Sequence, residues 1–364
     1  MKKELLIIAV LLFSFDFRLS AQPDEARLRH EADSLHEVMF TIDTHIDTPI
    51  CTNHPEGDYG VEKGQVTFPL MEKGGLDAAL FAVYIEQGPR DAQSLQKAVD
   101  YVRNEFLLFK KHLDSNSNIA AQAFDSEDFL KYKAQGKRIV MFSIENGYAL
   151  EKDLSNLDMF YDMGVRAITL SHNYNNDICD ASRDSVAEWN GLSPFGEQVV
   201  ARMNELGMII DLSHVATSTL FDVVEKSKAP VIASHSAVRK LRNHARNLWD
   251  DEIKAIARQG GLIQVAAEKY FLSATAPKKA TVKTFVDHVD YVRDLVGIEH
   301  VGIGTDFDGG GGLVDLRNAG DMKNITVEML RRGYTHDEIK MFWGGNFLRV
   351  LGQVEKISEE LRGE

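Results

Sequence analysis

Three features of the sequence predict an α/β fold of the (β/α)8 TIM barrel class. Eight short apolar runs recur along the 364 residues, each followed by a loop and by a stretch in which apolar residues recur with helical spacing. The runs are apolar almost throughout, which is typical of parallel strands that are buried on both faces. They begin about 37 residues apart on average, a spacing that fits βα units with some longer loops.

Each run is expected to form one strand, and eight strands are the number that closes such a barrel. In chain order the strands are expected at Val38 to His45, Ala78 to Tyr84, Arg138 to Glu145, Arg166 to Ser171, Met208 to Leu212, Pro230 to Ser234, Gly261 to Ala266 and His300 to Thr305. The clearest helices between them are expected at Asp91 to His112, Ser193 to Leu206, Ala216 to Lys226 and Thr281 to Val296. Gly207 and Gly297 directly follow two of these helices, where a stop signal is expected.

One barrel domain is expected over residues 22–364, with a short helical arm from Asp24 to Leu35 at its start. The alternative is an open doubly wound sheet, which usually carries a glycine-rich phosphate-binding turn after its first strand. The residues at that place, Asp43 to Asp47, contain no glycine. The barrel is therefore favoured.

The first 21 residues have the parts of a secretory signal peptide. Lys2 and Lys3 precede an apolar run from Leu5 to Phe15. The segment ends on small residues, and we expect cleavage after Ala21. The apolar run is too short for a helix across a bilayer of about 30 Å, and no Cys follows that could carry a lipid. We expect an exported protein, periplasmic or extracellular, without a membrane anchor.

The balance of charge excludes some partners. Lys and Arg number 41 against 55 Asp and Glu, which gives a formal net charge of −14. Nucleic acids and anionic membranes both require a basic surface, so neither is expected as the main partner. Cys51 and Cys179 allow one disulfide at most, and both the free and the bonded state are left open.

Ionisable side chains stand at or just beyond the ends of most of the expected strands. In chain order they are His45, Asp47, Glu145, His172, His214, His235 and Asp306. Barrel enzymes place their sites at the carboxyl ends of the strands, and core packing gives no reason for apolar strands to end in such residues. His45 and Asp47 are two residues apart, so they face the same side and can bind one ion together. The convergence predicts a metal site.

Five of these residues are candidate metal ligands, and they are His45, Asp47, Glu145, His214 and His235. Five ligands exceed the four of a mononuclear zinc site. Glu145 has two carboxylate oxygens, which can bridge two ions about 3.5 to 4 Å apart. Imidazole and carboxylate without thiolate favour zinc, with manganese, iron and cobalt left open. The sequence therefore predicts two Zn²⁺ ions per chain.

The motifs around these residues resemble those of a known family. They are Asp43-Thr44-His45-Ile46-Asp47-Thr48-Pro49, Ile144-Glu145-Asn146-Gly147, Leu170-Ser171-His172-Asn173, Gly191-Leu192-Ser193-Pro194-Phe195-Gly196, Met208-Ile209-Ile210-Asp211-Leu212-Ser213-His214, Ser234-His235-Ser236, Arg246-Asn247 and Gly302-Ile303-Gly304-Thr305-Asp306-Phe307-Asp308-Gly309. In this order, across nearly the whole of residues 22–364, the chain closely resembles the membrane (renal) dipeptidase family of zinc hydrolases.

The resemblance implies a barrel of the metal-dependent hydrolase type with a binuclear zinc site. One ion would be held by His45 and Asp47 and the other by His214 and His235, with Glu145 bridging them. The resemblance also implies roles for three further residues: His172 stabilises the tetrahedral intermediate, Arg246 binds the terminal carboxylate of the substrate, and Asp306 handles protons.

The expected activity is that of a zinc-dependent dipeptidase in which a hydroxide between the two ions attacks the peptide bond. Asp306 would take a proton and pass it to the leaving amine. Arg246 would make a two-pronged contact with the free carboxylate, which explains cleavage of dipeptides rather than proteins. The family also accepts D-residues at the C-terminal position, so small dipeptides of both kinds are the expected partners.

Two other functions compete with this reading. A barrel amidohydrolase acting on cyclic amides or lactones would resemble His-x-His on the first strand, where this chain has His45 and Asp47. A non-catalytic metal- or peptide-binding protein would be expected to lack ligands or Asp306, and none is missing. Ala266-Ala267 stands where the family usually has an Asn-aromatic pair, which leaves the side-chain preference open. A homodimer is also left open.

The remaining histidines, His244 among them, have no matched spacing and are interpreted as surface or structural residues. The glycine run from Gly309 to Gly312 is interpreted as a flexible loop at the barrel mouth, because no Lys-Ser/Thr follows that would indicate a phosphate-binding loop.

Overall fold

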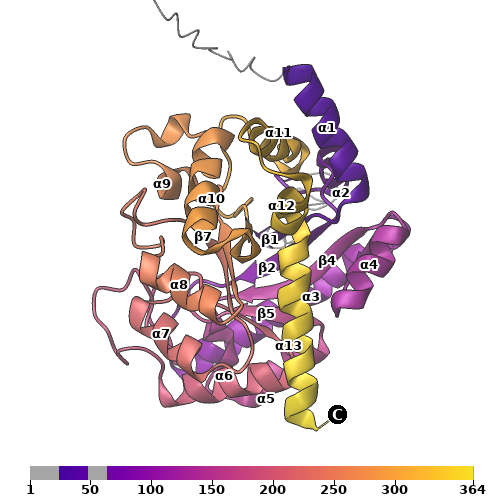
Figure 1. Cartoon of the computed structure of the whole chain (residues 1–364). Coiled ribbons are helices and arrows are strands. Elements are labelled where there is room, and N and C mark those ends of the chain that lie inside the picture. Colours follow the sequence, from indigo (N-terminus) through magenta and orange to yellow (C-terminus); the bar gives the residue numbers. More distant parts are fainter. Residues whose placement is uncertain (1–23, 48–63, 364) are drawn as a thin grey trace, which may run out of the picture.

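The computed structural model describes residues 24–47 and 64–363, and the strands in these residues join one parallel sheet. Eight of them follow one another in the order β1-β2-β4-β5-β6-β7-β8-β9. The strands are β1 (Ile42–Ile46), β2 (Ala78–Tyr84), β3 (Ala120–Gln122), β4 (Arg138–Glu145), β5 (Val165–Thr169), β6 (Ile209–Asp211), β7 (Ile232–Ser236), β8 (Leu262–Val265) and β9 (Val301–Ile303). The predicted (β/α)8 barrel is confirmed, and helices surround it (Figure 1).

The barrel closes between β9 and β1 at the carboxyl ends of these two strands. Ile46 and Phe307 form a parallel bridge there. The backbone N–H of Asp306 donates to the His45 carbonyl (3.0 Å), and the N–H of Asp47 donates to the Phe307 carbonyl (2.9 Å). The contact that closes the barrel therefore also fixes the backbone of three predicted site residues.

The helices follow the strands as a βα repeat requires. They are α1 (Glu25–Val38), α2 (Phe68–Gly74), α3 (Ala92–Ser115), α4 (Ser126–Ala134), α5 (Leu154–Asp162), α6 (Pro194–Leu206), α7 (Thr217–Lys226), α8 (Asp250–Arg258), α9 (Lys269–Leu272), α10 (Val282–Val296), α11 (Lys323–Arg331), α12 (His336–Lys340) and α13 (Asn346–Arg362). The four helices predicted from sequence are α3, α6, α7 and α10, and each is confirmed with ends shifted by at most three residues. Side chains cap two of them: Asp91 accepts from the first turn of α3, and Ser193 accepts from the Gly196 N–H of α6.

The bounds of β5 to β9 differ from the predicted ones by one or two residues, and two larger details of the predicted strands are wrong. The first strand begins at Ile42 and not at Val38, because Val38 is the last residue of α1 and is 71% exposed. Met39 then takes an extended backbone as the helix cap, and a run of apolar residues does not mark such a change. The second detail is β3, which was not predicted. It pairs only with β4, outside the barrel path, and three residues are too few to show a periodic pattern.

The amino ends of the strands surround an apolar core. Seven strands contribute buried side chains to it, and these are Ile42, Ala78, Leu80, Ile139, Met141, Ala167, Ile209, Ile232 and Leu262. The last helix, α13, packs against this core through Phe347, Val350, Leu351 and Val354. Figure 1 shows α13 in yellow, crossing the ends of the strands. At this end of the barrel the described side chains pack closely against one another.

Helix α1 occupies the place of the predicted arm and extends three residues beyond it. It lies beside α11 (Figure 1) and is anchored by His36, whose ring nitrogens lie 2.9 Å from the Gly75 carbonyl and 2.8 Å from the Thr326 hydroxyl. His36 is buried and structural, as its lack of matched spacing indicated.

Two of the predictions from sequence fall outside the residues that the structure describes. The expected signal peptide and Cys51 lie outside the described residues, whereas Cys179 is buried in the core. Among the residues that are described, no helix is both long and apolar enough to span a membrane.

Candidate active site

The carboxyl ends of the strands open into a pocket of about 650 Å³. Six of the eight residues predicted from the sequence line it, namely Asp47, Glu145, His172, His214, Arg246 and Asp306. The other two, His45 and His235, are buried against Glu145. The structure thus brings together all eight residues, which come from six different strands or the loops that follow them.

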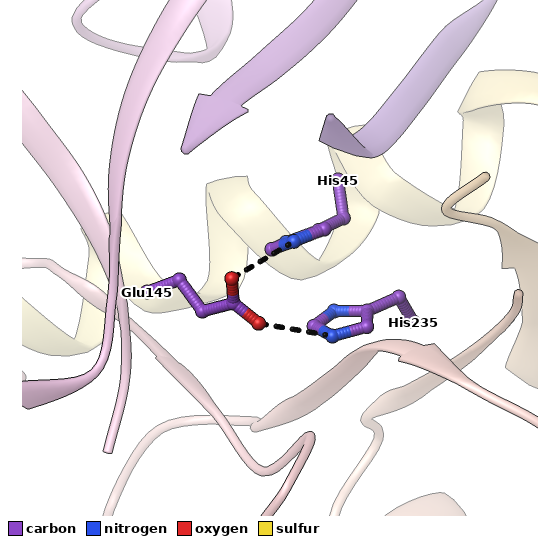
Figure 2. Close-up of side chains that lie close together, drawn as sticks. All are labelled: His45, Glu145 and His235. Atoms are coloured by element: carbon purple, nitrogen blue, oxygen red, sulfur yellow. Dashed lines mark ion pairs between the residues drawn. The ribbon is translucent and has the colours of Figure 1, made fainter. Parts of the chain in front are cut away.

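Glu145, the last residue of β4, lies at the centre of this cluster. Its Oε1 atom is 3.0 Å from Nε2 of His214 and 3.3 Å from Nε2 of His235. Its Oε2 atom is 3.7 Å from Nε2 of His45. Figure 2 shows one carboxylate oxygen turned toward each of the two histidines that it draws. This is the arrangement that a bridging carboxylate needs.

Two further groups extend the cluster to either side. Nε2 of His45 lies 3.5 Å from Oδ2 of Asp47, and ligand atoms of these two residues and Asp306 lie within 4.8 Å of one another. On the other side, atoms of Glu145, His172 and His214 meet the same condition. His45, Glu145 and His235 form a third such group, so the predicted assignment of His45 and Asp47 to one ion, and of His214 and His235 to the other, stays a prediction.

Unusual backbone angles aim two of these side chains into the pocket. His214 and Asp306 each follow a strand by three residues and have φ values of 71° and 63°, in the left-handed region that residues other than glycine seldom adopt. Such conformations are concentrated at functional sites, because the surrounding structure must hold them in place. Gly309 has a related role, since a side chain there would overlap the carboxylates of Asp47 and Asp306.

A chain of hydrogen bonds to its Nδ1 atom orients the ring of His235. Its Nδ1 atom is 2.8 Å from the Ser234 hydroxyl, and that hydroxyl donates to Asp211 (2.6 Å). Asp211 also accepts from the Thr169 hydroxyl (2.5 Å) and the Ser234 N–H (2.8 Å). Because Ser234 uses its only proton on Asp211, it accepts from Nδ1 of His235. The Nε2 atom of His235 is therefore left with a free lone pair, which is the state that binds a metal ion.

Burial and crowding give the carboxylates of the pocket unusual proton affinities. Burial, helped by the charge of Glu145, raises the pKa of Asp47 to about 6. Burial and the charge of Asp47 raise the pKa of Asp306 well above its usual range. Burial opposes protonation of His45, but the charges of Glu145 and Asp47 outweigh it and raise the pKa of that imidazole to about 10. Carboxylates are crowded together here away from solvent, an arrangement that a bound cation would stabilise.

The residues present fit a metal centre. Nε2 of His45, Oδ1 of Asp47 and Nδ1 of His214 are buried and have no hydrogen-bond partner in the described part of the chain. Nε2 atoms of His214 and His235 lie only 3.0 Å apart, and a single proton at most can lie between them. The donors are imidazole nitrogens and carboxylate oxygens, the set expected for zinc. The cluster therefore supports a metal cofactor.

Arg246 stands at the wall of the pocket, on the loop between β7 and α8. It is 3% exposed, and one guanidinium nitrogen donates to the His235 carbonyl (3.1 Å). Its Nε atom has no acceptor among the described residues. Burial lowers the pKa of Arg246 to about 10, so the side chain stays charged at neutral pH. A buried cation with an open donor can bind a carboxylate.

Sequence reasoning missed several residues of this site. Asp43 accepts from the N–H and hydroxyl of Thr305 (2.8 and 2.5 Å), which holds β1 to the segment before Asp306. Tyr84 lies with its ring 4.6 Å from that of His172. Asp43 and Asp211 both belong to the family motifs, but the sequence did not show what they bind. A hydrogen bond to a residue distant in the chain leaves no pattern in a single sequence.

Comparison with known proteins agrees with this geometry. Residues 29–364 match the profile of the membrane dipeptidase family, peptidase family M19, and the chain belongs to this family. The dipeptidase aclJ of Aspergillus oryzae is 30% identical over 98% of this chain and 89% of its own length. Dipeptidase 3 of Rattus norvegicus is 28% identical over 93% of this chain and 70% of its own length.

Solved structures give the same result. The probable dipeptidase PvdM from Pseudomonas aeruginosa is 30% identical, with a TM-score of 0.86 over 91% of this chain and 99% of that one. The family and the shared barrel identify the chain as a hydrolase of the metallopeptidase class, with small peptides as its class of substrate.

Proposed function

We propose that this chain is a zinc-dependent dipeptidase that binds two Zn²⁺ ions and hydrolyses dipeptides, including those with a D-residue at the C-terminal position. The observation that carries the proposal is the place of Glu145, between His45 on one side and His214 and His235 on the other. When bound, two zinc ions supply a water acidified to hydroxide near neutral pH and a Lewis acid for the peptide carbonyl.

The protein side chains supply the remaining steps. Burial lowers the pKa of His172 to about 4, so its imidazole is neutral and can donate one hydrogen bond to the oxygen that gains charge in the transition state. The raised pKa of Asp306 makes its carboxylate a stronger proton acceptor, which suits a group that takes a proton and returns it to the leaving amine. Arg246 holds the terminal carboxylate through its open donor.

Metal content and a dipeptide panel test this proposal together. We expect elemental analysis to find two zinc ions per chain after reconstitution, and we expect hydrolysis of both L-Ala-L-Ala and L-Ala-D-Ala. One ion or none would contradict the binuclear site. Hydrolysis of the L-L dipeptide alone would remove the D-residue from the proposal, and activity on a lactone with none on either dipeptide would favour the amidohydrolase alternative.

The role of Arg246 can be separated from simple support of the fold. Arg246→Ala should lose charge-assisted hydrogen bonds worth about 1.5 to 3 kcal/mol each, which is at least about a tenfold drop in kcat/KM for a dipeptide. An amidated dipeptide lacks the carboxylate, so the wild-type protein should cleave it poorly and the variant should lose little more. Equal losses for the acid and amide forms would show that Arg246 only supports the fold.

We also propose that the protein is exported, with cleavage after Ala21. The support is the order of basic, apolar and small residues in positions 1–21. Expression of the full chain with its own N-terminus, followed by N-terminal sequencing of the secreted material, should give Gln22 as the first residue. Recovery of the uncleaved chain inside the cell would contradict export.

A further inference from the structure

The pocket has an acidic side and a basic side. The acidic side is the metal cluster around Glu145. The basic side comprises Arg246, Arg183 and His244, all of which line the same pocket. One substrate carboxylate needs only one of these groups, the buried Arg246. Arg183 and His244 lie on loops outside the family motifs, and a single substrate carboxylate leaves both of them without a ligand.

Arg183 is an exposed cation on a loop that is held in place. The loop joins β5 to α6, and its Ser182 N–H donates to the His214 carbonyl (2.7 Å). The Ala181 N–H donates to the Asn175 side chain (2.8 Å), and the Asn175 N–H donates to Asp184 (3.1 Å). The backbone on both sides of Arg183 is thereby fixed over the pocket.

Acidic residues near this loop have other partners. Asp177 and Glu188 pair with Arg90 at 3.1 and 2.8 Å, and Asp184 accepts from backbone N–H groups. Arg183 itself makes no hydrogen bond or ion pair with any residue that the structure describes. Its charge nevertheless reaches the pocket, since it contributes to lowering the pKa of His172, His244 and Arg246. The guanidinium is left available at the pocket rim.

His244 adds a neutral donor beside this cation. Burial, followed by the charges of Arg242 and Arg246, lowers the pKa of His244 to about 4, so the ring is neutral at pH 7. Its Nδ1 atom accepts from the Arg246 N–H (3.2 Å), which leaves the proton on Nε2. The ring packs against Phe271, with centroids 4.8 Å apart. The Nε2–H is therefore free to donate to an anion.

Glu268 also lines this pocket, and its carboxylate is already engaged. Its carboxylate caps α9 by accepting from the N–H groups of Tyr270 (2.7 Å) and Phe271 (3.0 Å). Burial raises the pKa of Glu268. Glu268 is therefore not an ion-pair partner of Arg183.

We propose that Arg183 and His244 form a subsite for a second carboxylate, so that dipeptides with Asp or Glu at the C-terminal position are preferred substrates. The inference rests on the proposed dipeptidase function. With the scissile bond at the metal cluster and the terminal carboxylate at Arg246, the C-terminal side chain branches from the carbon next to that carboxylate. An acidic side chain there reaches the basic side of the pocket, where two donors remain.

The test compares Ala-Glu with Ala-Gln, which differ in charge but hardly in size. The wild-type protein should favour Ala-Glu by about fivefold in kcat/KM, the size of an ion pair that is partly exposed. The difference should lie mainly in KM, because the contact exists before the reaction begins. Arg183→Gln should bring the ratio close to one, and Arg183→Lys should restore part of it.

Lys240→Gln is the matched control. Lys240 is exposed in the loop after β7, does not line the pocket, and gives the same change of charge. That variant should keep the wild-type ratio. An equal fall in Arg183→Gln and Lys240→Gln, or no preference in the wild-type protein, would overturn the subsite. If Ala-Ala is cleaved and Ala-Glu is not preferred, only the subsite fails. If no dipeptide is cleaved, the proposed function fails and the subsite with it.

Discussion

The two ends of the barrel are built from the same strands and differ in the chemistry of their buried side chains. At the amino end, residues such as Ile42 and Leu262 pack with Phe347 of α13, and apolar contact fills the space. At the carboxyl end, Glu145 and its neighbours are equally buried but carry charge and unpartnered atoms. Stability and reactivity are therefore separated along one axis, and changes at each end should affect one property and spare the other.

The largest effect is expected at Glu145, where the two sets of donors meet. Glu145→Gln keeps the size of the side chain but removes the charge between His45 and His214. We expect loss of bound zinc and a fall in kcat of about a thousandfold or more, equivalent to several kcal/mol of charge stabilisation. Elemental analysis and kinetics would measure both, with circular dichroism to check the fold. Full zinc content in this variant would contradict the bridging role.

The second-largest effect is expected at Asp306, where a substitution should abolish most of the activity without loss of the metal ions. Asp306→Asn keeps the left-handed backbone, which Asn tolerates well, and removes the group that exchanges a proton. Turnover should fall by about a hundredfold to ten-thousandfold while both metal ions stay bound. If the ions were lost with the activity, Asp306 would be a ligand, and the predicted division between ligands and proton carrier would be wrong.

The amino end should show the reverse pattern. Phe347 is 1% exposed, and its ring lies 5.8 Å from that of Phe129. Phe347→Ala should lower the free energy of unfolding by about 3 to 5 kcal/mol, because it leaves a cavity in a dry core. Urea unfolding would measure this loss. The kcat/KM per folded molecule and the metal content should stay at wild-type values, and a parallel loss of metal would show that the two ends are coupled.

The smallest effect concerns the hydrogen bonds that orient a ligand without touching the metal. Ser234→Ala removes the hydroxyl between Asp211 and His235, so Nδ1 of His235 loses its acceptor. Metal affinity should weaken by about tenfold to a hundredfold. Zinc competition with a chromogenic chelator would measure it, and Ser234→Thr, which keeps the hydroxyl, serves as the control. Similar losses in both variants would mean that packing, and not the hydrogen bond, is responsible.

The local part of this structure could be read from the sequence. Continuous apolar runs fixed the places of β2 and β4 to the residue, because a strand buried on both faces leaves a pattern in a single short segment. The eight predicted site residues were visible for a related reason, since most follow such a run directly. Arg246 is the exception. It lies ten residues beyond β7, and only the family resemblance pointed to it.

What the sequence by itself determined is the order of the elements, the chemistry at the ends of the strands and the family to which they belong. The tertiary structure alone decided how Asp43 joins β1 to the segment after β9, how Asp211 reaches Ser234, and how Arg183 and His244 come to line one pocket. Periodicity and capping act over a few residues, so they leave a local trace. Contacts between different strands and loops depend on closure of the whole barrel, which brings together side chains from 23 residues apart, as for Asp211 and Ser234, to 262 residues apart, as for Asp43 and Thr305.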